Sequence, residues 1–147
     1  MRLSYHSIFF VLLGCGGLFT IYLFQDYLDF YSLLSLKWPS KLDYSPQAQN
    51  VDVIPFVINK VFRYIFNDLF AICIIYGFFK EKKYMSFSFF VMIFGMVILL
   101  PTYIVFFLHR PEGFSSMISH LHRIVMNPVL MMLLIPAFFY QKKIWRS

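Results

Sequence analysis

Charged residues are scarce in this chain of 147 residues. Asp, Glu, Lys and Arg make up 14% of the sequence, whereas hydrophobic residues make up 60% and the mean hydropathy is +0.69. A soluble domain of this length could not bury so much Phe, Leu and Ile. The composition therefore excludes a soluble globular protein and predicts one integral membrane domain covering residues 1–147.

Cysteine and glycine are rare as well, with two and six copies. Cys15 and Cys73 both fall within apolar segments, where a thiol is inert, and a disulfide between them is geometrically possible but not expected. The sequence contains no Cys/His spacing of a metal site, no glycine-rich phosphate loop and no internal repeat. We therefore predict no metal and no cofactor, and no motif identifies a catalytic residue.

Four apolar segments predict four transmembrane helices in an all-α fold. They cover approximately residues 7–24, 57–79, 85–108 and 124–140. The first and third carry no charge over 18 and 24 residues, which is enough to cross a hydrocarbon core about 30 Å thick. The first also fits the apolar region of a secretory signal, since Arg2 precedes it. Because the flanking "QDYLDFYSLL" lacks a small-residue cleavage site, we expect a retained helix.

The second segment is interrupted by polar residues. Only Leu69 to Phe79 is free of charge, so the helix either spans with Arg63, Asn67 and Asp68 inside the membrane or re-enters. We predict a full span, because an even number of crossings agrees with the distribution of charge.

Proline predicts irregularities in the third and fourth segments. Pro101 is expected to kink the third. In the fourth, Asn127 before Pro128 predicts either a kink in one continuous helix or a second helix with proline in its first position.

Basic residues gather on one side of the predicted spans. That side holds seven basic residues and one acid, Glu81, whereas the remaining chain holds six of each sign. The seven are Arg2, Lys80, Lys82, Lys83, Lys142, Lys143 and Arg146. Short loops rich in Lys and Arg stay cytoplasmic, so we predict both termini inside and residues 25–56 outside. Basic residues that flank spans interact with the lipid bilayer and do not indicate nucleic-acid binding.

The outer loop begins with the sequence "FQDYLDFYSLLSLKW", residues 24–38. Aspartates and serines recur there at every third position among leucines and aromatic residues. This pattern predicts an outer interfacial helix after the first span, anchored by Tyr27, Tyr31 and Trp38. The following "PSKLDYSPQAQNVDVIP" is turn-rich and predicts an exposed connector.

The polar residues of the second segment share one helical face. They are Lys60, Arg63, Tyr64, Asn67 and Asp68, at offsets of 0, 3, 4, 7 and 8. Asp68 is the deepest charge, about 18 Å from the cytoplasmic boundary at a rise of 1.5 Å per residue. Because an unpaired carboxylate is costly at that depth, we expect it to have a partner or a proton.

A second polar face precedes the fourth segment. After Gly113 a new helix is predicted to start at Ser115 or Ser116, and polar residues follow on one side of it. They are Ser116, His120, Arg123 and Asn127, at offsets of 0, 4, 7 and 11. We predict that this face meets that of the second segment, where Arg123 or His120 pairs with Asp68, and that His109, Arg110 and Glu112 form its outer lip.

Three interpretations of this polar cluster remain open. Its side chains can join helices through hydrogen bonds and one buried ion pair, without further function. They can form a groove that faces outward and binds a partner. They can also form an intramembrane enzyme or a proton relay that uses Asp68, His120 and Arg123. His109, Arg110 and Glu112 are more often solvated charges at headgroup level than parts of a site.

The length, the four spans and the segment "HRPEGFSSMISHLHRIVMNPVLMMLLIPAFFYQKK" resemble the exosortase F system-associated membrane proteins of Bacteroidota. The likeness covers most of the chain and is strongest over residues 101–143. It implies a bacterial inner-membrane protein that accompanies an exosortase, an enzyme that cleaves C-terminal sorting signals with Cys, Arg and His near the outer face.

The resemblance also implies candidate roles for residues. Arg63, Arg123 and His120 imitate part of such a site, but Cys15 and Cys73 are placed deep or toward the cytoplasm, so no outward nucleophile is present. The expected role is therefore that of an accessory protein whose partner is the exosortase or its sorted substrates.

Overall fold

The computed structural model describes residues 4–25, 27–34, 52–109 and 112–144, and every regular element within these ranges is a helix. The elements are α1 (Tyr5–Leu23), α2 (Phe30–Leu34), α3 (Val53–Phe79), α4 (Lys82–Phe94), the π-helix η1 (Gly95–Leu99), α5 (Leu100–His109), α6 (Ser115–Met126) and α7 (Val129–Ile144). The predicted all-α fold is confirmed.

Three stretches of helix are long and apolar enough to cross a membrane: α1, α3, and α4 through α5 as one stretch, Lys82–His109. A fourth crossing is possible if α6 and α7 together form one span, which is bent by 60° at their junction. The protein is thus a polytopic helical membrane protein. α3 is unbroken over 27 residues, about 40 Å at 1.5 Å per residue, so its length suits a full crossing better than a re-entrant loop.

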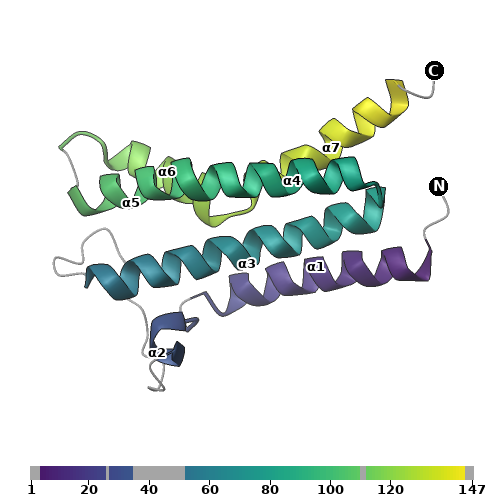
Figure 1. Ribbon diagram of the computed structural model, residues 1–147. Coiled ribbons are helices and arrows are strands. Elements are labelled where there is room, and N and C mark those ends of the chain that lie inside the picture. The colour runs from purple at the N-terminus through teal and green to yellow at the C-terminus, as the bar shows by residue number, and fades with distance from the viewer. Residues whose placement is uncertain (1–3, 26, 35–51, 110–111, 145–147) are drawn as a thin grey trace.

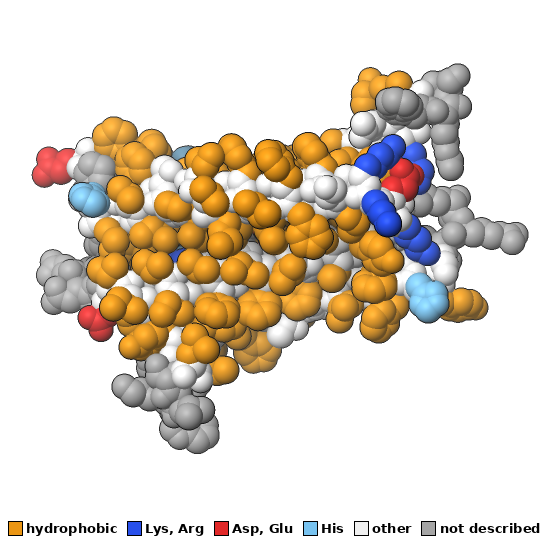
Figure 2. Space-filling view, in the orientation of Figure 1, with side chains coloured by type: hydrophobic (Ala, Val, Ile, Leu, Met, Phe, Trp, Pro, Cys, Tyr) orange, Lys and Arg blue, Asp and Glu red, His pale blue; other side chains and the backbone are white. Residues whose placement is uncertain are grey.

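Helices α1 and α3 and the α4–α5 stretch lie roughly along one axis, with α3 between the other two (Figure 1). The turn between α3 and α4 lies at the same end of the bundle as both chain termini (Figure 1). In the face shown in Figure 2, hydrophobic side chains cover the length of the bundle, and charged side chains gather at its two ends. This distribution matches a hydrocarbon layer with a polar boundary on each side.

The contact between α1 and α3 is the most extensive in the fold. Glycines on both helices allow it. A Cβ atom added to Gly14 would lie 2.5 Å from the Phe70 carbonyl oxygen, and one added to Gly77 would lie 2.8 Å from the Ser7 carbonyl oxygen. In lipid, hydrophobic surface does not drive helices together. Helices associate there through van der Waals contact, and the close backbone approach at these glycines supplies it.

Two apolar clusters fill the bundle, and a polar layer on α3 separates them. One cluster contains Phe56, Tyr64, Leu100, Tyr103, Phe107, Val125 and Met126. The other contains Ala71, Ile72, Ile75, Phe79, Tyr84, Met131 and Phe138. Asn67 and Asp68 lie between them along α3, and each side chain is only 5% exposed. The polar face predicted for the second span is therefore buried at this level.

The third span carries a π-helix next to Pro101, the residue expected to kink it. Helix α4 continues through η1 into α5, and Pro101 lies in the first turn of α5, directly after the wide π-turn. Because proline lacks an N–H and its ring clashes with the carbonyl four residues earlier, a wider turn accommodates it without breaking the span. The Tyr64 hydroxyl donates to the Met92 carbonyl at 3.1 Å, and Gly95 leaves room for its ring.

The fourth segment is two helices rather than the single helix predicted over residues 124–140. α6 ends at Met126 and α7 begins at Val129, with Asn127 and Pro128 between them. This matches the alternative of a second helix start more closely than a kink in a continuous helix. The break at Asn127 and Pro128 therefore lies within the segment that was predicted as one helix, residues 124–140.

The predicted interfacial helix is described only in part, because residues 35–51, including Trp38, lie outside the described ranges. The described part, α2, docks on α3. Phe30 stacks on Phe62, with ring centroids 5.5 Å apart, and Asn59 Nδ2 donates to Asp29 Oδ1 at 2.9 Å. Burial raises the pKa of Asp29, but hydrogen bonds from Ser32 and Asn59 outweigh it and lower the pKa, so this carboxylate stays charged.

Candidate functional site

A pocket of about 160 Å³ opens between α1, α3 and the α6–α7 break. It is lined by Leu18, Ile21, Tyr22, Arg63, Asn67, Asn127 and Pro128. Its volume suits one large side chain or a few water molecules. Three of the predicted site residues, from both predicted polar faces, therefore line one pocket: Arg63, Asn67 and Asn127. We call it the α6–α7 pocket.

Arg63 is held at the rim of this pocket by the end of α1. Its Nη2 atom donates to Gln25 Oε1 at 2.7 Å, two residues beyond the last residue of α1. The sequence pattern gave no sign of this contact, because Gln25 lies in a segment that was predicted to be an interfacial helix. The contact fixes a permanent positive charge beside an otherwise largely apolar lining.

Asn67 ties α3 to the break between α6 and α7. Its Nδ2 atom donates to the Met126 carbonyl oxygen at 2.6 Å. The last carbonyl groups of any helix lack partners within the helix, and Pro128 has no N–H to offer one. Because water is scarce inside a bilayer, a side-chain donor is needed there. Asn67 thus stabilises the end of α6 and holds Asn127 in the lining of the pocket.

Replacing Asn67 by leucine is expected to lower the free energy of unfolding by about 1–3 kcal/mol, the usual cost of a buried polar group left without a partner. Ser119→Ala is the control, since the Ser119 hydroxyl is exposed and bonds only within its own helix, to the Ser115 carbonyl. Its expected effect is within about 0.5 kcal/mol. Unfolding in detergent micelles, followed by circular dichroism, measures both. Equal effects would contradict the assigned role of Asn67.

Asp68 does not make the predicted ion pair. Its buried side chain hydrogen-bonds with that of Tyr64, one turn earlier on α3. Among the described residues, neither Arg123 nor His120 forms a salt bridge with it, because both are exposed on α6. The prediction that Asp68 pairs with Arg123 or His120 is wrong in this structure.

The orientation of α6 is the reason. The helix packs on α3, α5 and η1 through its apolar side, with Val125 and Met126 buried and Ile118 and Leu121 packed against them. These side chains complete the apolar cluster around Phe56 and Tyr103 through close van der Waals packing, which is what joins helices in lipid. Ser116, His120 and Arg123 therefore point outward, and the predicted meeting of two polar faces holds only at Asn127.

His122 is the residue that the pattern analysis missed. It lies off the polar face of α6, partly buried, and its Nδ1 atom hydrogen-bonds the Tyr103 hydroxyl at 2.9 Å. The apolar series at Ile118, Leu121 and Val125 could have identified it, since His122 is next to Leu121 on the same side.

The predicted outer lip is only partly described. His109 and Glu112 are exposed at the turn between α5 and α6, and His109 Nδ1 hydrogen-bonds the Val105 carbonyl of its own helix at 3.0 Å. Arg110 lies outside the described residues. Neither His109 nor Glu112 lines the α6–α7 pocket, so their position agrees with charges at a membrane boundary.

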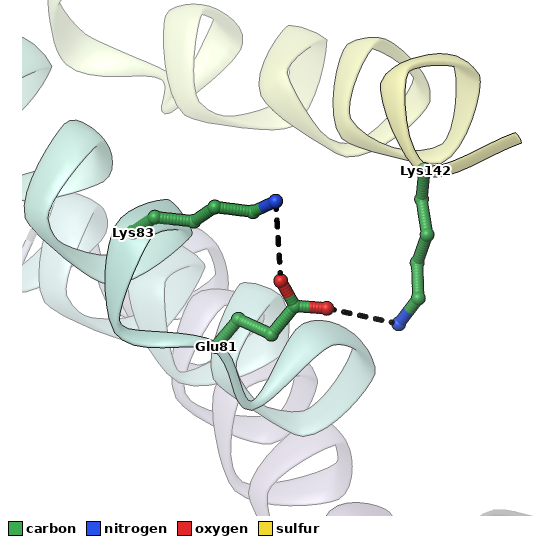
Figure 3. Close-up of polar contacts among 3 residues, drawn as sticks. All are labelled: Glu81, Lys83 and Lys142. Carbon is green, nitrogen blue, oxygen red and sulfur yellow. Dashed lines mark ion pairs between the residues drawn. The ribbon is translucent and has the colours of Figure 1, made fainter. Parts of the chain in front are cut away.

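A separate charged cluster lies at the end of the bundle that holds the α3–α4 turn. The Glu81 carboxylate lies between two ammonium groups, 3.4 Å from Lys83 Nζ and 3.5 Å from Lys142 Nζ (Figure 3). It joins the α3–α4 turn to the last turn of α7. Exposed pairs such as these contribute little stability, so the main consequence is a concentration of positive charge at this end.

In the part of the chain that the structure describes, the α6–α7 pocket is lined by no cysteine, histidine or carboxylate. Neither Cys15, exposed on α1, nor Cys73, partly buried on α3, belongs to its lining. Within the described ranges, no group of three or more His, Cys, Asp or Glu side chains is arranged to hold a metal ion. The polar groups of the lining are the Arg63 guanidinium, the amides of Asn67 and Asn127, and the Tyr22 hydroxyl, all of which can donate hydrogen bonds.

No family model, curated protein or solved structure matches this chain. The geometry of the pocket and the resemblance noted above are therefore the basis for assigning a function.

Proposed function

We propose that this chain is an accessory protein of a bacterial inner membrane that accompanies an exosortase-type enzyme in C-terminal protein sorting. In this role it binds the enzyme or the sorting helix of its substrates and catalyses nothing itself. The observation that carries the proposal is the α6–α7 pocket, which offers Arg63, Asn67 and Asn127 at a helix break and contains no cysteine in its described lining. The resemblance over residues 101–143 supplies the identity of the partner.

The pocket suits a polar group on a helix within the membrane. A guanidinium group and two amides in largely apolar surroundings form stronger hydrogen bonds than they would in water. Such donors form hydrogen bonds with carboxylates, amides and backbone carbonyls of a neighbouring span. A volume of about 160 Å³ admits one such side chain.

An intramembrane enzyme or proton relay based on Asp68, His120 and Arg123 is less well supported. Asp68 is buried against Tyr64, whereas His120 and Arg123 are exposed on a different helix. Acid–base catalysis requires proton donors and acceptors within hydrogen-bond reach of one substrate. No observation in the described part of the chain brings these three groups together.

The proposed orientation places both termini and the Glu81 cluster in the cytoplasm. Its basis is the concentration of Lys80, Lys82, Lys83, Lys142 and Lys143 at one end of the bundle. In a protein without its two native cysteines, a cysteine replacing Glu112 is expected to react with a membrane-impermeant thiol reagent in intact cells. A cysteine replacing Glu81 should react only after permeabilisation. Labelling of position 81 in intact cells would overturn the orientation.

Site-specific crosslinking tests the proposed function. A photoreactive amino acid replaces Leu18, which lines the pocket, or its neighbour Phe19, which is 62% exposed and lies on the lipid side of α1. The two positions share a helix and a depth, so Phe19 is a matched control. In the native membrane, position 18 is expected to give an adduct with the exosortase or a sorted substrate that position 19 does not give. Identical adducts from both positions, or none from position 18 at normal expression, would contradict the proposal.

A further inference from the structure

Helix α6 presents polar side chains on the outside of the bundle. Ser116, Ser119, His120 and Arg123 are all exposed. In the neighbouring α4–α5 stretch, by contrast, every exposed side chain from Phe87 to Leu108 is apolar. α6 packs directly on that span through η1 and α5. These four side chains form a polar strip beside the exposed apolar side chains Met117 and Ile124, on a bundle whose adjacent surface is apolar.

The strip reaches well into the membrane. The carbonyl oxygen of Met126, at the end of α6, accepts a hydrogen bond from Asn67, the fifteenth of the 27 residues in α3. Arg123 lies about 4.5 Å further out, at a rise of 1.5 Å per residue. If α3 extends equally beyond both sides of a hydrocarbon core about 30 Å thick, Arg123 lies about 12 Å below the outer boundary. A charged group at this depth on a lipid-facing surface is unfavourable unless a polar partner covers it.

A second copy of this chain does not provide that partner from its described residues. Asp29 and Asp68 are buried. Asp52 precedes α3 and Glu112 lies in the turn before α6, both at the far outer end, and Glu81 is engaged by two lysines at the opposite end. None of these acids is both exposed and at the depth of Arg123. Among the described residues, whose ranges leave out Asp26 and Asp43, charge complementarity therefore points to a different protein.

We infer that the exposed side of α6 is the docking surface for a transmembrane helix of another protein, which places a carboxylate opposite Arg123. Arg–carboxylate pairs form two parallel hydrogen bonds, so the contact fixes both the depth and the rotation of the docked helix. His120 and Ser116, one and two turns further out, offer further hydrogen bonds along the same line. The inference rests on the proposed function only in taking the partner to be a membrane protein, and it adds the chemistry by which that partner is recognised.

Model transmembrane peptides test the inference directly. The full-length protein is placed in phosphatidylcholine vesicles with a labelled leucine–alanine helix that carries Glu, Gln or Leu about 12 Å below the outer boundary. Energy transfer between protein and peptide reports binding. We expect the Glu peptide to bind about tenfold more tightly than the Leu peptide, with the Gln peptide in between, as interhelical hydrogen bonds in membranes predict.

Variants of Arg123 separate charge pairing from general affinity. Arg123→Leu is expected to abolish the preference for Glu, and Arg123→Lys to retain part of it, because lysine keeps the charge but not the two parallel bonds. Phe90→Leu, on the lipid-facing side of α4, is the control and should change nothing. A Glu preference that survives in Arg123→Leu, or equal binding of all three peptides, would overturn the inference.

Two further measurements exclude other occupants. Loss of the Glu preference when phosphatidylglycerol is added would mean that a lipid phosphate covers Arg123, and self-association that depends on Arg123 would mean that a second copy does. Either result would overturn the inference. The crosslink from Leu18 does not involve α6, so failure of the proposed function and failure of this docking surface can be told apart.

Discussion

Replacing Gly14 by alanine is expected to lower the free energy of unfolding by about 1–3 kcal/mol, the usual cost of overpacking a well-packed interface. The added Cβ atom would lie 2.5 Å from the Phe70 carbonyl oxygen and 2.5 Å from Ile74 Cγ1. A backbone carbonyl cannot rotate away as a flexible side chain can, so α1 must move outward from α3 along its length. Because this helix pair has the most extensive contact in the fold, its separation affects the whole bundle.

Gly16 supplies the matched control on the same helix. A Cβ atom added there meets nothing within 4 Å, so Gly16→Ala removes only the flexibility of glycine and is expected to stabilise α1 by up to about 1 kcal/mol. Unfolding in micelles, followed by circular dichroism, compares the two variants under the same conditions. If Gly14→Ala is as stable as Gly16→Ala, the close approach of α1 and α3 does not hold the bundle together.

The spans could be predicted from the sequence because each depends on local composition alone. An uncharged stretch such as residues 85–108 has few alternatives to a membrane helix, whatever its neighbours are. The predicted face from Lys60 to Asp68 also appears in the structure, where Asn67 and Asp68 are buried and Arg63 borders the pocket. One long helix with a fixed period of 3.6 residues preserves such a pattern.

The orientation of α6 could not be predicted in the same way. Its sequence carries two good faces, an apolar one at Ile118, Leu121 and Val125 and a polar one at His120 and Arg123. Which face turns inward depends on the surface offered by α3 and α5, and that surface exists only once they have packed. The pattern analysis chose the polar face because Asp68 needed a partner. The structure provides one on the same helix, Tyr64, one turn away.

The α6–α7 pocket lay beyond prediction for a related reason. It combines α1, α3 and the break at Asn127 and Pro128, three parts of the chain that no sequence period connects. The break itself was predicted as one of two alternatives from the Asn–Pro pair. Its consequence, a Met126 carbonyl that needs the Asn67 amide, requires the relative depth of two helices to be known.

Restoration of a deletion strain measures most directly whether this chain acts by binding rather than by catalysis. The readout is the processing of C-terminally sorted surface proteins at matched expression of each variant. The double variant Cys15→Ser, Cys73→Ser is expected to restore processing fully, because a cysteine nucleophile requires a thiolate and neither thiol lines the pocket. Arg63→Ala is expected to lose most of it, and Arg123→Ala to impair it, because each removes a fixed charge that holds a partner. Loss of processing in the double cysteine variant, with normal expression and normal processing by Arg63→Ala, would contradict the account and make the chain a catalyst.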